Sequence, residues 1–395
     1  MAAGTIQLAG YVTSDGEFLK QILDFGAEHL KRCYQCGTCS VVCPLTPLEQ
    51  PFPRKEMAWA QWGLKDRLLK DVDVWLCHQC NDCSAYCPTD ARPGDLMAAA
   101  RNYQITTYAT PRFLAKAATQ LKYLPLLFVY PLLLTFIVLL FAVLLPEGGY
   151  VLPEGDILFE NFIPRLYIDA TALGTMAIAF AIASVGMVRF WRNITQSRYG
   201  GVPPEDESFF RSLVATVGEI LKHSDFKRCG VNASRYHAHG AIFYGALFLF
   251  FATTGAFLYT TVFLWIGVNV RGGELSLPIY DPVKVIGNVG GIALFAGLLW
   301  VTYRRLARRQ EAGGSTYFDW LLIALLFLTT VTGFLLEALR YAQVAVVAYP
   351  LYLVHLVFVY ASFIYAPFSK LAHLFYRTLA MTYARQIGRK ARQQL

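Results

Sequence analysis

Two copies of one cysteine pattern constrain this chain more than any other feature of its sequence. Each copy reads Cys-x2-Cys-x2-Cys-x3-Cys-Pro; the first runs from Cys33 to Pro44 and the second from Cys77 to Pro88. Three cysteines at two-residue gaps can wrap one face of an iron-sulfur cubane, and the fourth, followed by proline, reaches the neighbouring cluster. The pattern predicts an N-terminal domain built around two [4Fe-4S] clusters.

The exchanged fourth cysteine sets the expected ligands of each cluster. Cluster one is predicted to use Cys33, Cys36, Cys39 and Cys87, and cluster two Cys77, Cys80, Cys83 and Cys43. A pair of zinc sites is the alternative, but zinc needs a closed tetrahedron of ligands, and its cysteines usually come in pairs. Disulfides are disfavoured by the tight spacing, so the domain is expected in a reducing compartment.

The composition changes near residue 118. Residues 1–118 contain eight of the nine cysteines and a normal share of charge, and the ninth, Cys229, is interpreted as a structural thiol. Long apolar runs dominate from about residue 122, so that 55% of the 395 residues are hydrophobic and the mean hydropathy is +0.40. That is too apolar for a soluble enzyme of this size. We expect a mainly α-helical protein with two domains: an α-helical ferredoxin domain (1–118) and a transmembrane cytochrome b bundle (119–395).

Six segments are long enough to cross a hydrocarbon layer of about 30 Å, which takes roughly 20 helical residues. Their approximate ranges are 123–145, 166–188, 240–266, 286–303, 318–338 and 344–367. The connection after the first segment is acidic, whereas those after the second and fourth, and the C-terminal tail, are rich in Arg and Lys. By the positive-inside rule, both termini and the cysteine domain are expected in the cytoplasm.

The basic residues do not indicate a nucleic-acid partner. The formal net charge is +8, but the Arg and Lys side chains lie in the loops that flank apolar segments rather than on one soluble face. The first 30 residues lack a charged start and an apolar core, so no signal peptide is expected. Within the long basic connection, residues 209–221 have apolar side chains at helical spacing, which favours a helix along the membrane surface over a plain connector.

Histidines near the last span suggest haem. His355 and His373 are 18 residues apart, which is five turns if the helix is continuous; they would share one face, roughly 27 Å apart. Histidine within a span is costly unless partnered, and axial ligation of haem iron is a common solution. Two unrelated histidines, one buried and one interfacial, are the simpler alternative.

The opposing ligands are less determined. His239 faces His373 by depth, and His237, two residues away, points about 200° around the helix and cannot bind the same iron. A deeper start of the third helix would instead pair His239 with His355 and His223 with His373. The remaining possibility is that one haem is absent or differently ligated. We expect two haems b in this bundle, with one as the minimum.

Two acidic residues lie at membrane depth, Asp169 in the second span and Glu337 at the end of the fifth. Proton handling at a quinone site is one interpretation, and an interfacial carboxylate that reaches for water is the other. The second interpretation suits Glu337 better.

The chain also resembles a known family. The stretches Pro51–Arg67, Asp73–Cys83 and Ala91–Asp95 resemble the C subunit of the quinone-interacting membrane-bound oxidoreductase (Qmo), whose two parts resemble the C subunit and the cytochrome b subunit of heterodisulfide reductase. The segment from His355 to His373 is similar to the last helix of the gamma subunit of respiratory nitrate reductase, in which both histidines bind haem. That family has a second helix with two histidines ten apart, whereas here Leu249 stands ten residues after His239.

The Qmo resemblance implies a role and partners. It implies electron transfer between a menaquinone pool, two haems b, the two clusters and flavin-containing and iron-sulfur sister subunits, with adenylylsulfate reductase as the eventual partner. Two rivals are a disulfide-reducing enzyme of the heterodisulfide reductase type and a membrane anchor without quinone chemistry. No Cys-Cys-Gly motif for a disulfide-reducing cluster occurs, so no substrate site of that kind is expected in this chain.

Exchange of the fourth ligand can be tested with Cys87→Ser. We expect this variant to perturb the cluster held by Cys33, Cys36 and Cys39, because Cys87 is assigned to it. Electron paramagnetic resonance of the reduced protein distinguishes the two clusters. Loss of the other cluster alone would contradict the crossed arrangement.

Overall fold

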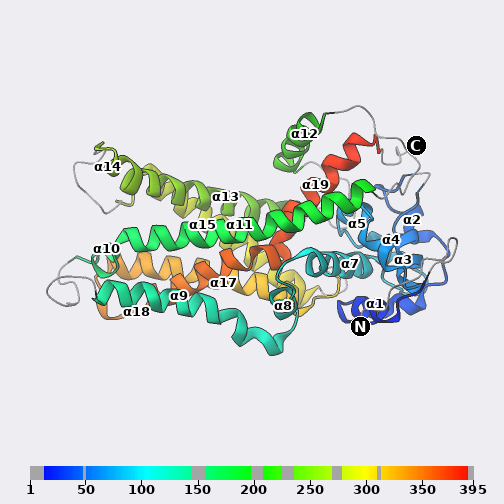
Figure 1. The fold of residues 1–395 in the computed structure, drawn as a ribbon, viewed down its shortest axis with the longest axis horizontal. Coiled ribbons are helices and arrows are strands. Elements are labelled where there is room, and N and C mark those ends of the chain that lie inside the picture. Colours follow the sequence, from blue (N-terminus) through cyan, green and yellow to red (C-terminus); the bar gives the residue numbers. More distant parts are fainter. Residues whose placement is uncertain are drawn as a thin grey trace, which may run out of the picture.

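The computed structural model describes residues 13–47, 50–144, 156–196, 208–223, 235–268, 278–308 and 313–389. Within these ranges the chain is helical and contains no strand. Figure 1 shows an elongated molecule, with a compact N-terminal part in blue at one end and long helices that run along the horizontal axis. The expected mainly α-helical fold class is confirmed. Cys229 lies outside the described residues.

Short helices surround a buried core in the N-terminal part. They are α1 (Gly16–Asp24), η1 (Glu28–Arg32), α2 (Thr38–Val41), α3 (Arg54–Gln61), α4 (Lys65–Leu69), α5 (Asp73–Leu76), α6 (Asp82–Ala85), α7 (Pro93–Tyr108) and α8 (Arg112–Ala117). Residues 57–69 do not form a single helix, because α3 and α4 are separated at Gly63. Gly63 has φ +67° and lies too close to the Asp15 backbone to carry a side chain. Trp59 is buried, but Trp62 is 60% exposed, so only Trp59 can shield the interior.

Six helices are long and apolar enough, by length and composition, to cross a membrane, as the sequence predicted. They are α9 (Leu124–Leu144), α11 (Arg165–Gln196), α13 (Arg235–Phe257, extended by a π-helical turn to Val262), α15 (Pro282–Ala307), α17 (Tyr317–Tyr341) and α18 (Ala345–Ile364). Large apolar side chains such as Phe136, Phe180, Phe251 and Ile292 point outward and are at least half exposed. Such a surface is stable in lipid and unfavourable in water.

Helices α13 and α15 approach each other closely. A Cβ atom on Gly245 would lie 2.6 Å from the backbone nitrogen of Leu294, so only glycine permits this contact. Small residues at helix interfaces are the usual means of close packing in membranes. This contact fixes the position of α13, which carries His239 near its beginning.

The last span does not continue as one helix to His373, and this corrects the sequence-based expectation. Helix α18 ends at Ile364, two short 3-10 turns follow, and α19 (His373–Gln386) is a separate helix. The chain is extended at Ser369, with φ −107° and ψ 178°, and the Ser369 hydroxyl accepts a hydrogen bond from the Leu371 N–H. His355 and His373 therefore do not share a helix face, and a helical rise cannot give their separation.

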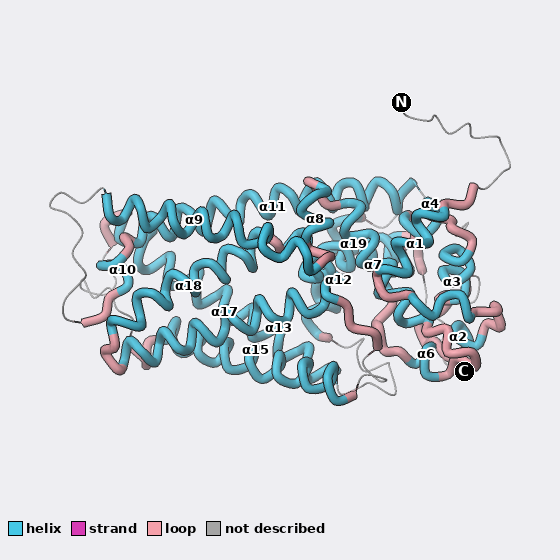
Figure 2. Tube along the Cα trace, turned by 90° about the horizontal axis from the view of Figure 1, so that it is seen from below, coloured by secondary structure: helices cyan, strands magenta, loops and turns pink. Residues whose placement is uncertain are grey.

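The expected helix in the basic connection is found as α12 (Phe209–Lys222), although the Pro203–Pro204 turn before it lies outside the described residues. Helix α12 contacts α19, and Arg385 of α19 pairs with Glu219 of α12 at 2.8 Å. It therefore packs on another helix of the chain along one side (Figures 1 and 2).

Four buried aromatic rings join the N-terminal part to the bundle. Trp75 of α5 stacks on Tyr376 of α19 at 5.2 Å, and Phe190 of α11 meets Tyr376 edge to face at 5.3 Å. Tyr108, at the end of α7, completes the group and accepts a hydrogen bond from Asn193 through its hydroxyl. Helix α11 reaches this group because it continues two turns beyond the predicted span. One hydrophobic core thus runs through both parts of the molecule.

The aromatic junction predicts a stability effect. Tyr376→Ala should cost about 3–5 kcal/mol, the range for truncating a buried aromatic side chain, because it leaves a cavity between the two parts. Thermal unfolding of the detergent-solubilised protein would measure the loss as a lower melting temperature. Tyr280→Ala is the matched control, since that side chain is 81% exposed. Equal effects of the two substitutions would contradict a joining role for the junction.

Candidate functional site

The two cysteine motifs fold into the same local structure. In each motif, the residue just before the second cysteine has a left-handed backbone, with φ 65° at Gln35 and φ 56° at Gln79. Its N–H donates a hydrogen bond to the sulfur of the first cysteine. The residue after the second cysteine is also left-handed, and a one-turn helix (α2 or α6) then carries the third cysteine. These turns curl each backbone around its sulfur atoms.

The structure brings the eight cysteines together in two groups of four. The thiols of Cys33, Cys36 and Cys39 interact electrostatically with that of Cys87. Those of Cys77, Cys80 and Cys83 interact with Cys43, and a cavity lies among these four. Each fourth cysteine thus lies beside the first three cysteines of the other motif. None of the eight forms a disulfide in the described structure.

The electrostatics of these groups favour a bound cation. Burial, reinforced by neighbouring thiols, raises the pKa of Cys39 to about 11 and that of Cys43 to about 12. Cys36 differs because it is exposed, and its hydrogen bond with the Thr38 hydroxyl lowers its pKa. Four thiolates cannot share a buried site unless positive charge compensates them, and iron supplies that charge. The donor set therefore fits [4Fe-4S] clusters.

Three of the candidate haem ligands meet at the end of the bundle next to the N-terminal part. The rings of His239 and His373 have centroids 6.2 Å apart and planes at 78°. Since imidazole nitrogen binds a metal at about 2 Å, two rings on opposite sides of one iron have centres roughly 6 Å apart. This geometry favours the pair His239 and His373 over a pairing of His239 with His355.

Hydrogen bonds leave the Nε2 lone pairs of both rings available. Nδ1–H of His373 donates to the Lys370 carbonyl at 2.6 Å. His223 donates from Nδ1 to the Leu221 carbonyl at 3.4 Å, so its Nε2 accepts from Nδ1 of His239 at 3.1 Å. Burial lowers the pKa of His373 to about 4, so it is neutral at physiological pH, as metal ligation requires. His223 therefore orients His239 and does not face His373.

The other two histidines lie apart from this pair. His237 is exposed beside Tyr236, as its position around α13 predicts. His355, in the middle of α18, donates from Nδ1 to the Thr332 hydroxyl of α17 at 2.8 Å, and that hydroxyl donates to the Leu328 carbonyl. This tautomer also leaves Nε2 able to bind iron. No second histidine is found opposite His355 among the described contacts.

Asp169 and Glu337, the two acidic residues expected at membrane depth, both have hydrogen-bond or ion-pair partners. The Thr261 hydroxyl donates to Asp169 at 2.5 Å, in the π-helical turn after α13. Glu337 pairs with Lys284 and accepts from Asn288, both at 3.1 Å. Glu337 is thus held by α15 and does not simply reach for water.

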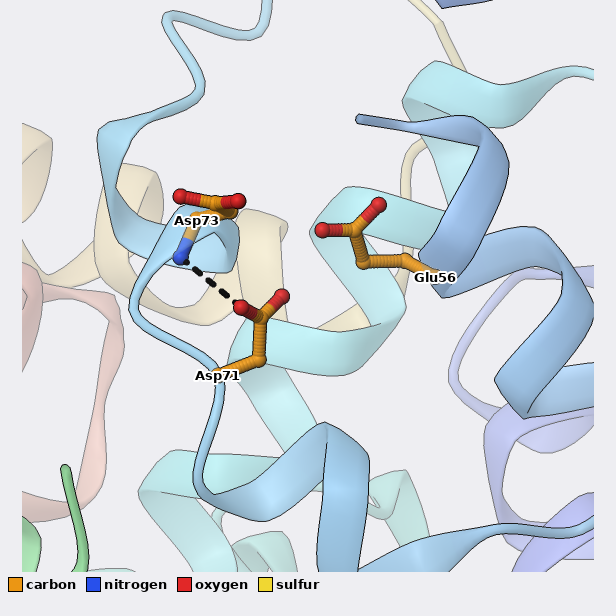
Figure 3. Close-up of side chains that lie close together, drawn as sticks. All are labelled: Glu56, Asp71 and Asp73. Atoms are coloured by element: carbon orange, nitrogen blue, oxygen red, sulfur yellow. Dashed lines mark hydrogen bonds between the residues drawn. The ribbon is translucent and has the colours of Figure 1, made fainter. Parts of the chain in front are cut away.

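A buried acidic cluster, which the sequence motifs did not indicate, lies near cluster two. Figure 3 shows Glu56, Asp71 and Asp73 facing one another, with the Asp73 N–H donating to Asp71. Lys55 lies within 2.8 Å of all three carboxylates, and Arg389 lies 2.6 Å from Asp73. Burial raises the pKa of Glu56 well above its usual range, and the positive charge of Lys55 opposes this rise. The chain's own cations occupy the place that a metal ion would take.

This cluster ties the C-terminal segment to the iron-sulfur part, because Arg389 follows α19. From the sequence, Lys55 could neutralise the charge of an iron-sulfur cluster or dock a partner. Neither interpretation foresaw its burial among carboxylates. The only indication of this acidic cluster in the sequence is the pair Asp71 and Asp73, two residues apart and just before Cys77.

Comparisons with known proteins divide the chain at the same place as the composition does. The family model described as citrate utilization protein B matches residues 119–394, and a 4Fe-4S dicluster domain matches residues 29–91. Citrate utilization protein B of Escherichia coli is 29% identical over 63% of this chain and 64% of its own length. No solved structure matches.

The other relatives match the N-terminal part. The C subunit of the H(2):CoB-CoM heterodisulfide,ferredoxin reductase of Methanothermobacter marburgensis is 35% identical over 22% of this chain and 48% of its own length. A protein of Archaeoglobus profundus that is described as similar to the C subunit of heterodisulfide reductase is 38% identical over 22% and 47%. The chain therefore spans between about half and two thirds of the length of these relatives. The iron-sulfur content and a general redox electron-transfer role follow from these similarities.

Replacement of the histidines tests the pair. His373→Ala should lower the haem-to-protein ratio of the purified chain by at least half, because one axial ligand of the pair is removed. Pyridine haemochrome absorbance measures the ratio. His237→Ala, a change in an exposed histidine beside the same helix start, should leave it unaltered. Haem loss in His237→Ala with full haem in His373→Ala would refute the pairing.

Proposed function

The chain belongs to the citrate utilization protein B family, and we propose that it is the membrane electron-transfer subunit of a quinone-linked oxidoreductase. In this role it carries electrons between menaquinone in the membrane and a flavin-containing partner bound to the iron-sulfur part. The observation that supports this most strongly is the arrangement of redox ligands. Two groups of four cysteines and one pair of histidines lie in one continuous body that extends from the apolar bundle to its exposed end.

Each set of residues has a defined task in the proposal. Cys33, Cys36, Cys39 and Cys87 hold one cluster, and Cys77, Cys80, Cys83 and Cys43 hold the other, each cluster supplying a one-electron carrier. His239 and His373 hold haem b, which His223 supports through its hydrogen bond to His239. His355 is the candidate ligand of a second haem, whose opposite ligand would not be a histidine.

The proposed reaction balances two electrons and two protons. A quinol that is oxidised to quinone releases two of each, and a flavin takes up the same number when it is reduced. The carriers pass electrons singly, so the two protons are released or taken up at the quinone itself. Asp169 is the acidic residue we propose for proton exchange there, because it lies half-buried near the beginning of α11 and accepts a hydrogen bond from a hydroxyl at 2.5 Å.

The proposed location follows from charge. With six spans, the chain segments before α9 and after α18 lie at the same end of the bundle, where α7 contacts the 3-10 turns after α18. We propose that this end, with the iron-sulfur part and both termini, faces the cytoplasm, because the basic connections lie on the same side.

The partner enzyme distinguishes two versions of the proposal. The family match favours a flavoprotein of citrate utilization, the process named for the Escherichia coli relative. The resemblance to Qmo instead implies flavin and iron-sulfur sister subunits linked to adenylylsulfate reductase, and the heterodisulfide reductase relatives support only its iron-sulfur part. A membrane anchor without quinone chemistry is the alternative from another functional class.

The test is reduction of haem by quinol. In the complex purified from membranes, a menaquinol analogue should reduce haem b, seen as sharpening of its α-band, and a quinone-site inhibitor should abolish this reduction. Dithionite reduction provides the control that haem is present and accessible. Haem that dithionite reduces but quinol does not would exclude the proposed role and leave the anchor.

A further inference from the structure

Two arginines from different helices of the membrane part contact the same loop of the iron-sulfur part. Arg377 of α19 donates to the Cys77 carbonyl at 3.1 Å. Arg235, the first residue of α13, donates to the carbonyl of Gln79 and lies 3.5 Å from that of His78. The loop Cys77–Cys80 contains two of the expected ligands of cluster two. Both helices therefore contact the binding loop of cluster two directly.

Each arginine is four residues from a member of the histidine pair. Arg235 precedes His239 on α13, and Arg377 follows His373 on α19. Residues four apart lie on one helix face, about 6 Å along the axis. The helices that present the two imidazoles to each other thus present two guanidinium groups to one cysteine loop, one turn away. The pair and the loop cannot move independently.

A third arginine reaches the same loop. Arg101 of α7 also donates to the Cys77 carbonyl, and another of its hydrogen bonds reaches the Val74 carbonyl at 2.8 Å. Two guanidinium groups, those of Arg101 and Arg377, therefore lie at the backbone carbonyl of one expected ligand of cluster two. Positive charge beside a cluster ligand stabilises the cluster when it gains an electron.

Cluster one has a different environment. Cys36 is exposed, and the neighbouring Tyr34 is 62% exposed. The first motif is therefore exposed to solvent at Cys36, whereas the Cys77–Cys80 loop of the second motif contacts the helices of the membrane part.

We propose that Arg235 and Arg377 are positioning residues that fix cluster two as the electron partner of the haem held by His239 and His373, and that raise its reduction potential. This inference rests on the proposed function and assigns the order in which electrons pass along the chain. They pass between haem and cluster two, then between cluster two and cluster one, and then between cluster one and the partner. One electron crosses at a time, so the haem iron loses what the cluster gains, or the reverse, and no atom or proton moves.

The experiment compares Arg377→Gln, Arg235→Gln and the double variant in the full complex. Redox titration with chemical mediators, followed by electron paramagnetic resonance, gives the potential of each cluster. We expect the potential of cluster two to fall and that of cluster one to stay constant, with haem and iron content retained. Quinol-driven reduction of cluster two should slow roughly tenfold in the double variant, because the pair and the loop are no longer held together.

Two matched variants separate positioning from general stability. Arg377→Lys keeps the charge and should restore most of the potential of cluster two. Arg385→Gln, on the same helix but paired with Glu219, should leave both potentials and the rate unchanged. If Arg377→Gln fails to fold, Arg235→Gln tests the same loop from α13.

An unchanged potential of cluster two in the glutamine variants, or a fall confined to cluster one, would overturn the inference. These outcomes are independent of the proposed function, because mediators reach the clusters without quinol. Failure of quinol to reduce haem in the unaltered complex would instead refute the proposed function.

Discussion

Docking of α19 between the two parts of the molecule is the contact on which the rest of the arrangement depends. Its residues meet the iron-sulfur part through the ring of Tyr376, the guanidinium of Arg377 and, just beyond the helix, Arg389 in the acidic cluster. The same helix begins with His373. A single helix therefore carries a candidate haem ligand and contacts the loop that contains Cys77.

Electrostatics explain why this junction is rich in arginine and lysine. The iron-sulfur part gathers eight thiols and a buried group of three carboxylates, each unfavourable as an anion when removed from water. Lys55 and Arg389 compensate the carboxylates, and Arg101 and Arg377 lie beside Cys77. Arg377 and Arg389, in the basic segment that follows the last span, thus lie against the Cys77 backbone and the Asp73 carboxylate.

Much of the architecture could be predicted because its signals are local. Hydropathy located all six long helices. Cysteine spacing led to a proposed set of cluster ligands, and the structure gathers the same eight thiols in two groups of four. The relation between His355 and His373 could not be predicted, since a count of 18 residues assumes a continuous helix. Helix α18 ends at Ile364, and Pro367 and the extended Ser369 follow in the break before α19. Pro350 lies inside the continuous α18, so a proline alone does not mark the break. The acidic cluster was missed because its members come from separate elements.

What the sequence by itself determined is the chemistry of this chain: two clusters, an apolar bundle and a set of histidines suited to haem. Ligand type and spacing along the chain specify these, because three cysteines at two-residue gaps can wrap one face of a cluster, and a spanning helix satisfies its own backbone hydrogen bonds. Only the tertiary structure decided which distant residues meet. His239 lies opposite His373, His223 behind His239, and Arg235 and Arg377 on one cysteine loop. Such contacts depend on how α13 and α19 pack, which no local pattern records.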